Sequence, residues 1–352
     1  MSLRQLSVAV LVAWCVPVLA AAQDKELVPD KLESEVKDKP VTGWVPKLSL
    51  GATFALAHNA HVAGAQDGTN FNLGPLLDFS IAFLHPEHEW KFSLSFRNVW
   101  TRTPVIDEFV KTIDMLKIES GYLYHNPNLR WIGPFALVGL DTSIFPGRDV
   151  RPTDTAYATT EIDGSATTET KSAIGLTNAF APLVLKQSAG AFLRPLERKE
   201  VTIDFRVGFG AREAWFQNGR VLNDDAATKD VVELKRLEDF SQVGGELFAG
   251  IAGAFVFEKF GIDRPIEYSV SCEVLLPFYS TLIPSGKKAI ELTTVDFQTK
   301  IGIKIFSWMG LDYALRVVRA PLITEDIQVQ NTLLLNFSYV YAPPPPAPAP
   351  AK

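Results

Sequence analysis

Apolar and polar residues alternate strictly over residues 201–212 of this chain. Apolar side chains from Val201 to Phe209 take one parity, and the positions between them are polar, charged or glycine. Successive side chains of a β-strand point to opposite faces, so the segment predicts a strand with one wholly apolar face. A soluble sandwich would bury such faces between short strands. Many long segments of this kind instead indicate a barrel whose outer face meets lipid.

The same alternation recurs along the chain and predicts twelve strands. The expected segments are 46–57, 71–84, 90–100, 111–124, 134–145, 183–194, 201–212, 242–258, 266–279, 290–305, 309–319 and 327–341. We therefore predict an all-β protein, a single antiparallel transmembrane β-barrel of about 12 strands formed by residues 44–341. Glycines within 242–258 are expected to ease sheet curvature or to allow a bulge.

The connections between the predicted strands alternate in length. Those after the second, fourth, sixth, eighth and tenth segments are tight, whereas others are longer, notably 146–182 and 214–241. Outer-membrane barrels have short periplasmic turns, longer external loops and an even strand number, so we expect both termini in the periplasm. Aromatic residues at segment ends, such as Trp44, Trp100 and Tyr339, suit the girdles at the two membrane interfaces.

Residues 1–22 have the features of a secretory signal peptide. Arg4 supplies the positive start, an apolar run follows, and three alanines ending at Ala22 form a small-residue cleavage site. The alternative, a membrane anchor, is disfavoured because the run is shorter than the roughly 20 residues of a spanning helix. Lipidation of Cys15 is disfavoured because Trp14 is too bulky for the preceding position. The predicted location is the bacterial outer membrane.

The two ends of the mature chain differ from the barrel in composition. Residues 23–43 are rich in charge and predict a periplasmic linker, with a small plug as the alternative. Residues 342–352 are almost entirely proline and alanine and predict an extended, disordered tail. The tail is expected to reach a cell-wall or periplasmic partner, or to be a passive end.

The amino-acid composition limits the classes of partner that the protein can bind. Hydrophobic residues make up 47% of the chain and charged residues 21%, which fits a barrel surface. The net charge of −6 argues against nucleic acid, because binding phosphate requires a basic face. Cys272 is the single cysteine left after cleavage, so no intramolecular disulfide is expected. The expected partners are outer-membrane lipid and, during biogenesis, the barrel-assembly machinery.

Charges of both signs occupy the parity that a barrel turns toward its lumen. The predicted lumen-lining residues are Asp78, Lys91, Arg97, Lys117, Glu119, Asp204, Arg206, Arg212, Glu246, Glu267, Glu273, Asp296, Lys300 and Lys304, with Asp141, Lys186 and Glu258 in the same pattern. Such charges can line a selective polar pore. They can equally pair across strands and fill the interior, and twelve strands lie between filled and open barrels.

No catalytic, cofactor-binding or metal-binding residue is predicted. Glu267 and Glu273 lie too far apart along one strand for a glycosidase dyad. The five histidines all fall in expected loops or turns, which disfavours Ser–His catalysis. Two groups have spacings that could hold a metal, His58 and His61 with Asp67, and His85 with His88. Without a cysteine or carboxylate cluster, solvated loop histidines are the better interpretation.

The long connection at 149–176 is rich in Thr, Ala, Asp and Glu. Such sequence seldom packs a core, so we expect a mobile, hydrated surface. It could bind a partner or fold over the mouth of the barrel, but no residue in it points to a particular ligand.

The order of these segments resembles a bacterial family of uncharacterised barrels, "domain of unknown function 3078". The resemblance is carried by Gly43-Trp44, Leu48-Ser49-Leu50, Trp90-Lys91-Phe92-Ser93-Leu94, Pro182-Leu183-Val184-Leu185-Lys186-Gln187-Ser188-Ala189-Gly190, Val243-Gly244-Gly245-Glu246-Leu247 and Leu335-Asn336-Phe337-Ser338-Tyr339. These are strand patterns rather than catalytic signatures. The connection 149–176 and the proline tail depart from the pattern. The resemblance implies an outer-membrane barrel and supplies no activity.

The sequence thus predicts a narrow or gated pore for small polar solutes. Two alternatives stay open: an adhesion or scaffold protein with a packed lumen, and a lipid-modifying outer-membrane enzyme. No enzymatic activity is expected, because the chain offers no convincing constellation of catalytic groups.

Overall fold

We describe the protein from a computed structural model. The described residues are 42–59, 68–198, 200–223, 228, 230–257, 262–306, 308–324 and 327–341. The predicted signal peptide and tail, and almost all of the predicted linker, lie outside these ranges. Within them, no helix has the length and apolar content needed to cross a bilayer.

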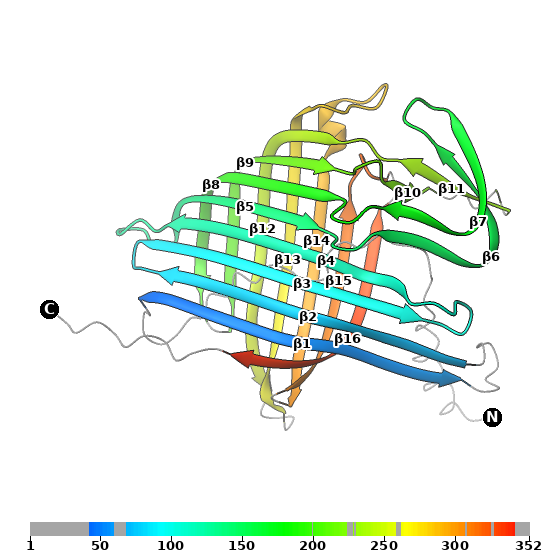
Figure 1. The fold of residues 1–352 in the computed structure, drawn as a ribbon. Helices are drawn as coiled ribbons and strands as arrows, with labels where there is room; N and C mark the ends of the chain where they lie inside the picture. The colour runs from blue at the N-terminus through cyan, green and yellow to red at the C-terminus, as the bar shows by residue number, and fades with distance from the viewer. Residues whose placement is uncertain are drawn as a thin grey trace, which may run out of the picture.

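Twelve strands close into one antiparallel barrel, which confirms the predicted fold class (Figure 1). They are β1 (Gly43–Asn59), β2 (Gly68–Leu84), β3 (His88–Arg102), β4 (Val110–Tyr124), β5 (Ile132–Thr142), β8 (Leu183–Glu197), β9 (Thr202–Trp215), β12 (Phe240–Phe257), β13 (Ile262–Ser280), β14 (Thr294–Phe306), β15 (Met309–Arg319) and β16 (Gln328–Tyr341). Each pairs with its neighbours in chain order, and β16 returns to pair with β1. Each predicted segment corresponds to one strand, with ends shifted by a few residues.

The two ends of the barrel carry connections of different length. Turns 85–87 and 125–131 lie at the short-turn end, where β1 begins and β16 finishes. The long-connection end carries 143–182 and 216–239. The predicted alternation of short and long connections is therefore present along the barrel.

The two longest connections are not hydrated loops, which corrects the prediction for 149–176. They form a four-stranded sheet of β6 (Gly147–Thr160), β7 (Ala166–Thr177), β10 (Arg220–Leu222) and β11 (Val231–Arg236), in the order β10-β11-β6-β7. This external sheet projects beyond the long-connection end of the barrel (Figure 1). Strand β11 pairs with β6 in parallel, so the sheet joins two connections that are far apart in sequence.

A small core explains why the external sheet forms. It consists of Tyr157, Ile174, Leu176, Val232 and Leu234, all buried. The Tyr157 side chain is fully buried, and its hydroxyl donates a hydrogen bond to Asp149 Oδ2 over 2.9 Å. Burial, together with the carboxylate, raises the pKa of Tyr157 to about 12. Neither connection alone has enough apolar surface for this core, so inspection of 149–176 by itself could not predict it.

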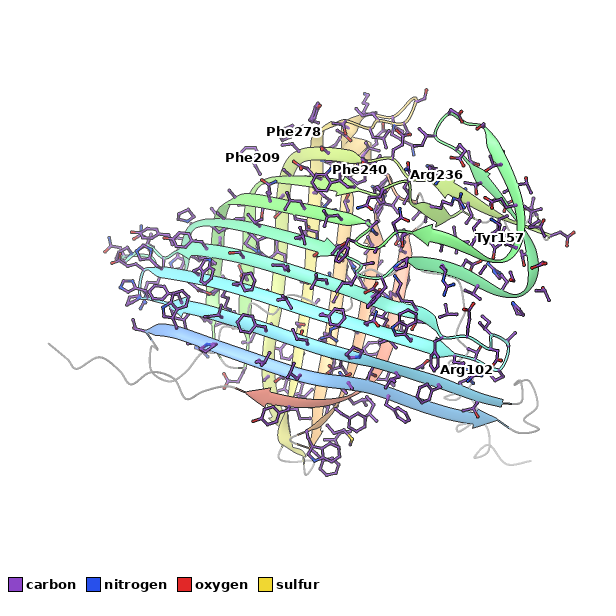
Figure 2. The ribbon with its side chains drawn as sticks, viewed as in Figure 1. Arg102, Tyr157, Phe209, Arg236, Phe240 and Phe278 are labelled. Carbon is purple, nitrogen blue, oxygen red and sulfur yellow. The ribbon has the colours of Figure 1, made fainter. Side chains whose placement is uncertain are left out.

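The barrel's outer surface is apolar. Phe209 and Phe278 are 71% and 62% exposed, and their rings meet on the outside of the wall (Figure 2). At the short-turn end Trp308 stacks between Phe306 and Phe337. This outward apolar face agrees with strands whose polar parity is turned inward, and it is the surface that a bilayer covers.

Two glycines allow a close approach of neighbouring strands. Gly190 on β8 and Gly208 on β9 lie opposite each other in the register. A Cβ at Gly190 would lie 2.1 Å from the Val207 carbonyl oxygen, and one at Gly208 would lie 2.2 Å from that of Ala189. Only glycine fits at such a point, where the sheet coils strongly.

Candidate functional site

Ion pairs line the lumen near the long-connection end. Arg212 on β9 and Glu273 on β13 lie 2.8 Å apart, although β12 separates their strands. Such a contact requires both side chains to project inward. Two further pairs are Lys186 with Asp141, 3.2 Å apart, and Arg316 with Asp296, whose Nε–Oδ1 distance is 3.0 Å. We call these six residues the charged layer.

A cavity of about 80 Å³ lies beside the charged layer. Every residue of the charged layer except Glu273 lines this cavity, and Asp114 and Gln242 add further polar groups to its wall. The amide nitrogen of Gln242 is buried without a hydrogen-bond acceptor among the described residues. The cavity is therefore a polar space with spare hydrogen-bonding capacity, large enough for a few water molecules or one small solute.

Buried apolar side chains form a cluster at the long-connection end of the lumen, and several of them line the same cavity. This apolar cap consists of Val184, Ala214, Phe216, Leu237, Phe240, Leu292 and Leu322. Its members come from strand ends and from three connections, so the barrel wall and the mouth segments share one core. Figure 2 places Phe240 at this mouth, beside the external sheet. The cap thus lies next to the charged layer, at the long-connection end of the barrel.

Hydrogen bonds hold the cap segments in place. Arg319 at the end of β15 donates to the carbonyl oxygens of Thr293, over 2.6 Å, and Glu291, over 3.2 Å. These bonds fix the short 3-10 helix η2 (Ala289–Leu292), which carries Leu292 into the cap. The Phe216 amide donates to Asp239 Oδ1 over 2.6 Å. The cap is thus attached to the barrel rim by few bonds, each from a connection or a strand end.

A second constriction lies at the short-turn end, and we call it the Arg194 cluster. Arg194 on β8 is 4% exposed and lies 3.2 Å from Glu89 on β3 and 3.6 Å from Asp204 on β9. Strands β4 and β5 separate β3 from β8, so this pair also crosses the lumen. His125 Nε2 lies 3.1 Å from the same Glu89 carboxylate. Glu197 Oε1 lies 3.5 Å from Arg194 as well, so one cation serves three carboxylates here.

His125 completes the cluster from the turn between β4 and β5. Its Nδ1 lies 2.9 Å from the Arg130 carbonyl oxygen, and its ring packs edge-on against the fully buried Phe192. The hydrogen bond to Glu89 raises the pKa of His125 above its ordinary value, although burial opposes the shift. This histidine is a structural member of the constriction rather than a solvated loop residue.

Most predicted lumen residues lie in ion pairs or ring contacts. The printed pairs are Asp78 with Arg97, Lys91 with Glu89, Lys117 with Glu119, Lys300 with Asp312, and Lys304 with Glu267. Arg206 lies 3.8 Å over the Phe248 ring, a cation–π contact. Glu246 covers Gly210, where an added Cβ would lie 2.4 Å from Oε2. The side chain of Glu258 lies outside the described residues.

The structure adds residues that the sequence pattern missed. Glu89, Arg194, Asp312 and Arg316 join the inward charges, and His125 joins them from a turn. Arg194 shares the inward parity of Lys186 at the end of the predicted segment 183–194, so strand parity could have found it. Strand parity could have identified these carboxylates as inward-facing. The partner of each charge, however, depends on the register of the strands across the barrel.

The candidate metal residues are not brought together as a metal centre. No group of three or more His, Cys, Asp or Glu side chains in the described ranges could hold a metal ion. His61 and Asp67 lie outside those ranges. His88 opens β3 rather than lying in a loop, and its Nδ1 lies 2.6 Å from the Tyr122 hydroxyl. His58 likewise belongs to β1.

Comparison with solved structures finds other membrane barrels. An outer-membrane channel from Pseudomonas putida F1 is 11% identical, with a TM-score of 0.37, over 90% of this chain and 100% of that one. The β-domain of the Bordetella autotransporter BrkA is 9% identical, with a TM-score of 0.34, over 86% and 100%. The translocator domain of NalP from Neisseria meningitidis is 8% identical, with a TM-score of 0.36, over 87% and 90%.

These similarities are too low to transfer any residue or role to this chain. No protein-family model matches it, and no curated protein matches it in sequence. The resemblance to the uncharacterised barrel family therefore stays a prediction. What the coordinates establish by themselves is a closed twelve-stranded barrel with an apolar exterior and a charged interior.

Proposed function

We propose that the chain is a bacterial outer-membrane β-barrel with a gated axial passage for small polar solutes. The apolar exterior and the closed, even-stranded sheet support a bilayer location. The chain ends would lie in the periplasm, because the short turns share their end of the barrel. The predicted leader, which lies outside the described residues, is consistent with export.

The observation that carries the gating proposal is the position of the apolar cap over the charged layer. The cap is not built from side chains of the wall alone. Here Phe216, Leu237, Leu292 and Leu322 come from connections that can move without breaking a strand pair. Below them lies the polar cavity of about 80 Å³. Displacing the cap would join this cavity to the long-connection end.

Single-channel conductance in planar bilayers tests the proposal. The wild-type protein is expected to show small, intermittent currents, since the cap closes the mouth most of the time. Arg319→Ala removes the two bonds that attach η2 to β15 and should raise the open fraction several-fold. Arg198→Ala removes an equal charge from an exposed turn at the opposite end of the barrel, and we expect it to leave the open fraction unchanged. Absence of current in both the wild type and Arg319→Ala would contradict the gate.

A scaffold with a packed lumen is the second candidate. The observation that favours it is that Arg194 and Arg212 each pair with a carboxylate across intervening strands. Such pairs brace the interior and narrow any axial path. The same conductance experiment separates the two candidates, because a braced scaffold passes no current even with the cap loosened. Neither candidate assigns a reaction to the chain, and a lipid-modifying activity stays an untested alternative.

A further inference from the structure

Hydrogen-bond donors form a row across three neighbouring strands in the wall of the cavity. Lys186 on β8 lies directly opposite Arg212 on β9, and Arg212 lies directly opposite Gln242 on β12. Residues that lie directly opposite each other on adjacent strands project from the same face of the sheet, and all three residues line the cavity. We call these three residues the donor row.

Two nitrogen atoms of the donor row have no acceptor in the described part of the chain. Gln242 is 1% exposed, and its Nε2 is buried without a hydrogen-bond partner. Arg212 donates to Glu273 through Nη2, but its Nε is also buried without a partner. A ligand that carries an acceptor would satisfy both nitrogens. A carboxylate suits them best, because hydrogen bonds between a guanidinium and a carboxylate are charge-assisted.

Two carboxylate oxygens in the same wall receive no hydrogen bond from the described residues. Asp141 on β5 has its Oδ2 3.2 Å from Lys186 Nζ, whereas its Oδ1 is buried without a partner. Asp114 on β4 is 1% exposed. Its Oδ2 accepts from the Phe145 amide over 2.6 Å, whereas its Oδ1 is likewise buried without a partner. The wall therefore suits a ligand that donates hydrogen bonds as well as accepting them.

The charges of the wall favour a ligand without net charge. The charged residues that line the cavity are three acidic and three basic ones, namely Asp114, Asp141, Asp296, Lys186, Arg212 and Arg316. Glu273 and Lys111, which pair with two of these residues from outside the wall, add one charge of each sign. An anion or a cation would therefore bring an uncompensated charge into a buried site. A zwitterion brings none.

The size and the apolar part of the cavity limit the ligand further. At about 80 Å³ the cavity admits a solute of only a few heavy atoms. Val184, Phe240, Val318 and Leu322 line it together with the polar groups. A polyol of the same size offers neither a charge to the donor row nor an alkyl group to these side chains. A short aliphatic amino acid offers both.

We propose that the cavity is a binding site for a small aliphatic amino acid in its zwitterionic form. The carboxylate of the ligand accepts hydrogen bonds from Arg212 and Gln242. Its ammonium group donates to Asp141 and Asp114, and its alkyl group lies against Phe240 and the other apolar side chains of the wall. The inference rests on the gated passage proposed above, because the ligand reaches the cavity when the apolar cap is displaced, and it names the class of solute that the passage holds.

Binding of three molecules of similar size tests the charge requirement. Radiolabelled L-alanine, propionate and ethylamine are each dialysed to equilibrium against the full-length protein in detergent micelles. Alanine should bind about tenfold more tightly than propionate, which lacks the ammonium group, and than ethylamine, which lacks the carboxylate. Absence of alanine binding, equal affinity for alanine and propionate, or displacement of alanine by an equal concentration of glycerol would overturn the proposal.

Gln242→Leu tests the donor row. An apolar side chain of similar size in place of a buried amide without an acceptor should leave the barrel folded. Alanine binding should weaken about tenfold, because the ligand's carboxylate loses a donor. Gln328→Leu is the matched control, since Gln328 Nε2 on β16 is also buried without a partner in the described ranges and Gln328 does not line the cavity. Equal affinity of the two variants for alanine would overturn the proposal.

Asp141→Asn tests the charge balance. It leaves the wall with one net positive charge, so alanine should bind more weakly, propionate should bind more tightly, and their order of affinity should reverse. Asp78→Asn removes a carboxylate from another lumen ion pair, with Arg97, away from the cavity, and should preserve the wild-type order. An unchanged order in Asp141→Asn, or an equal loss of both ligands, would overturn the proposal.

Failure of the amino-acid site and failure of the gate give different results. Dialysis measures occupancy of the cavity and does not require a current. Alanine binding by a barrel that passes no current, even as the Arg319→Ala variant, would support the site and contradict the gate. Gated current from a protein that does not bind alanine would support the gate and overturn the site.

Discussion

The side chains at the two ends of the lumen interact in different ways. At the long-connection end, the apolar cap excludes water with side chains such as Phe216 and Leu292, several of them from connections. At the short-turn end, the Arg194 cluster closes the interior with charges that project from the barrel strands themselves. Apolar contacts are non-directional and can be lost and regained, whereas a buried ion pair must keep its geometry.

This difference assigns different roles to the ends. A cap on connections can open while the sheet stays paired, so the long-connection end is suited to gating. Opening the Arg194 cluster would remove the buried guanidinium from both Glu89 and Asp204. The short-turn end is therefore suited to bracing the barrel, and substitutions at the two ends should differ in both size and kind of effect.

The largest effect is expected from Arg194→Ala. Removing one partner of a buried pair leaves uncompensated charge and costs about 3–5 kcal/mol of unfolding free energy. Urea unfolding in lipid vesicles, followed by tryptophan fluorescence, measures the loss. Arg198→Ala, an exposed turn residue, is the matched control and should be nearly neutral. If both variants are equally stable, the ends do not differ as described.

A smaller loss of stability, with a gain of current, is expected from Phe216→Ala. Truncating this 2% exposed ring should cost about 3 kcal/mol and leave a cavity in the cap. Conductance should rise because the smaller side chain thins the cap, whereas substitution of a bracing residue such as Arg194 should not raise it. Phe180→Ala, at a ring that is 52% exposed on the β7–β8 connection, provides the control. Unchanged conductance in Phe216→Ala alongside reduced stability would show that the cap is structural only.

The smallest effect is a pH dependence from His125. Its pKa is raised in the folded protein, so its contribution to stability is complete below its ordinary pKa of 6.5 and is lost as pH rises through the raised value. The group is only half-buried, so the change should be on the order of 1 kcal/mol or less. Unfolding measured from pH 6 to 9 should show a decline that His125→Gln abolishes. A wild-type profile that is flat, or that rises with pH, would count against the Glu89 contact.

The barrel could be predicted from the sequence because the alternation that marks its strands is a local pattern. Alternation between residues such as Phe205 and Arg206 is visible in any short window, and a lipid-facing surface enforces it on every strand. The external sheet depends instead on contacts between distant segments, since Tyr157 is buried by residues of β11 that lie far along the chain. Its apolar residues are too few in either connection to give a periodic signal.

The lumen was predictable in composition but not in pairing. Parity correctly selected charges such as Arg212 and Asp296, both of which line the cavity. It could not show that Arg212 reaches Glu273 over β12, because that contact depends on curvature and on closure of the sheet. The end of the β1–β16 ladder was likewise hidden, since Thr53 and Phe54 continue the same alternation across the point where pairing with β16 ends.

The parallel pairing of β6 with β11 has a mechanical consequence. It links the β5–β8 connection to the β9–β12 connection, and Arg236 at the end of β11 donates to the Asn218 carbonyl oxygen over 2.7 Å. The next residue, Leu237, belongs to the apolar cap. The external sheet is thus connected directly to the cap at the mouth of the barrel. A displacement of this sheet would therefore also move Leu237 and the cap around it.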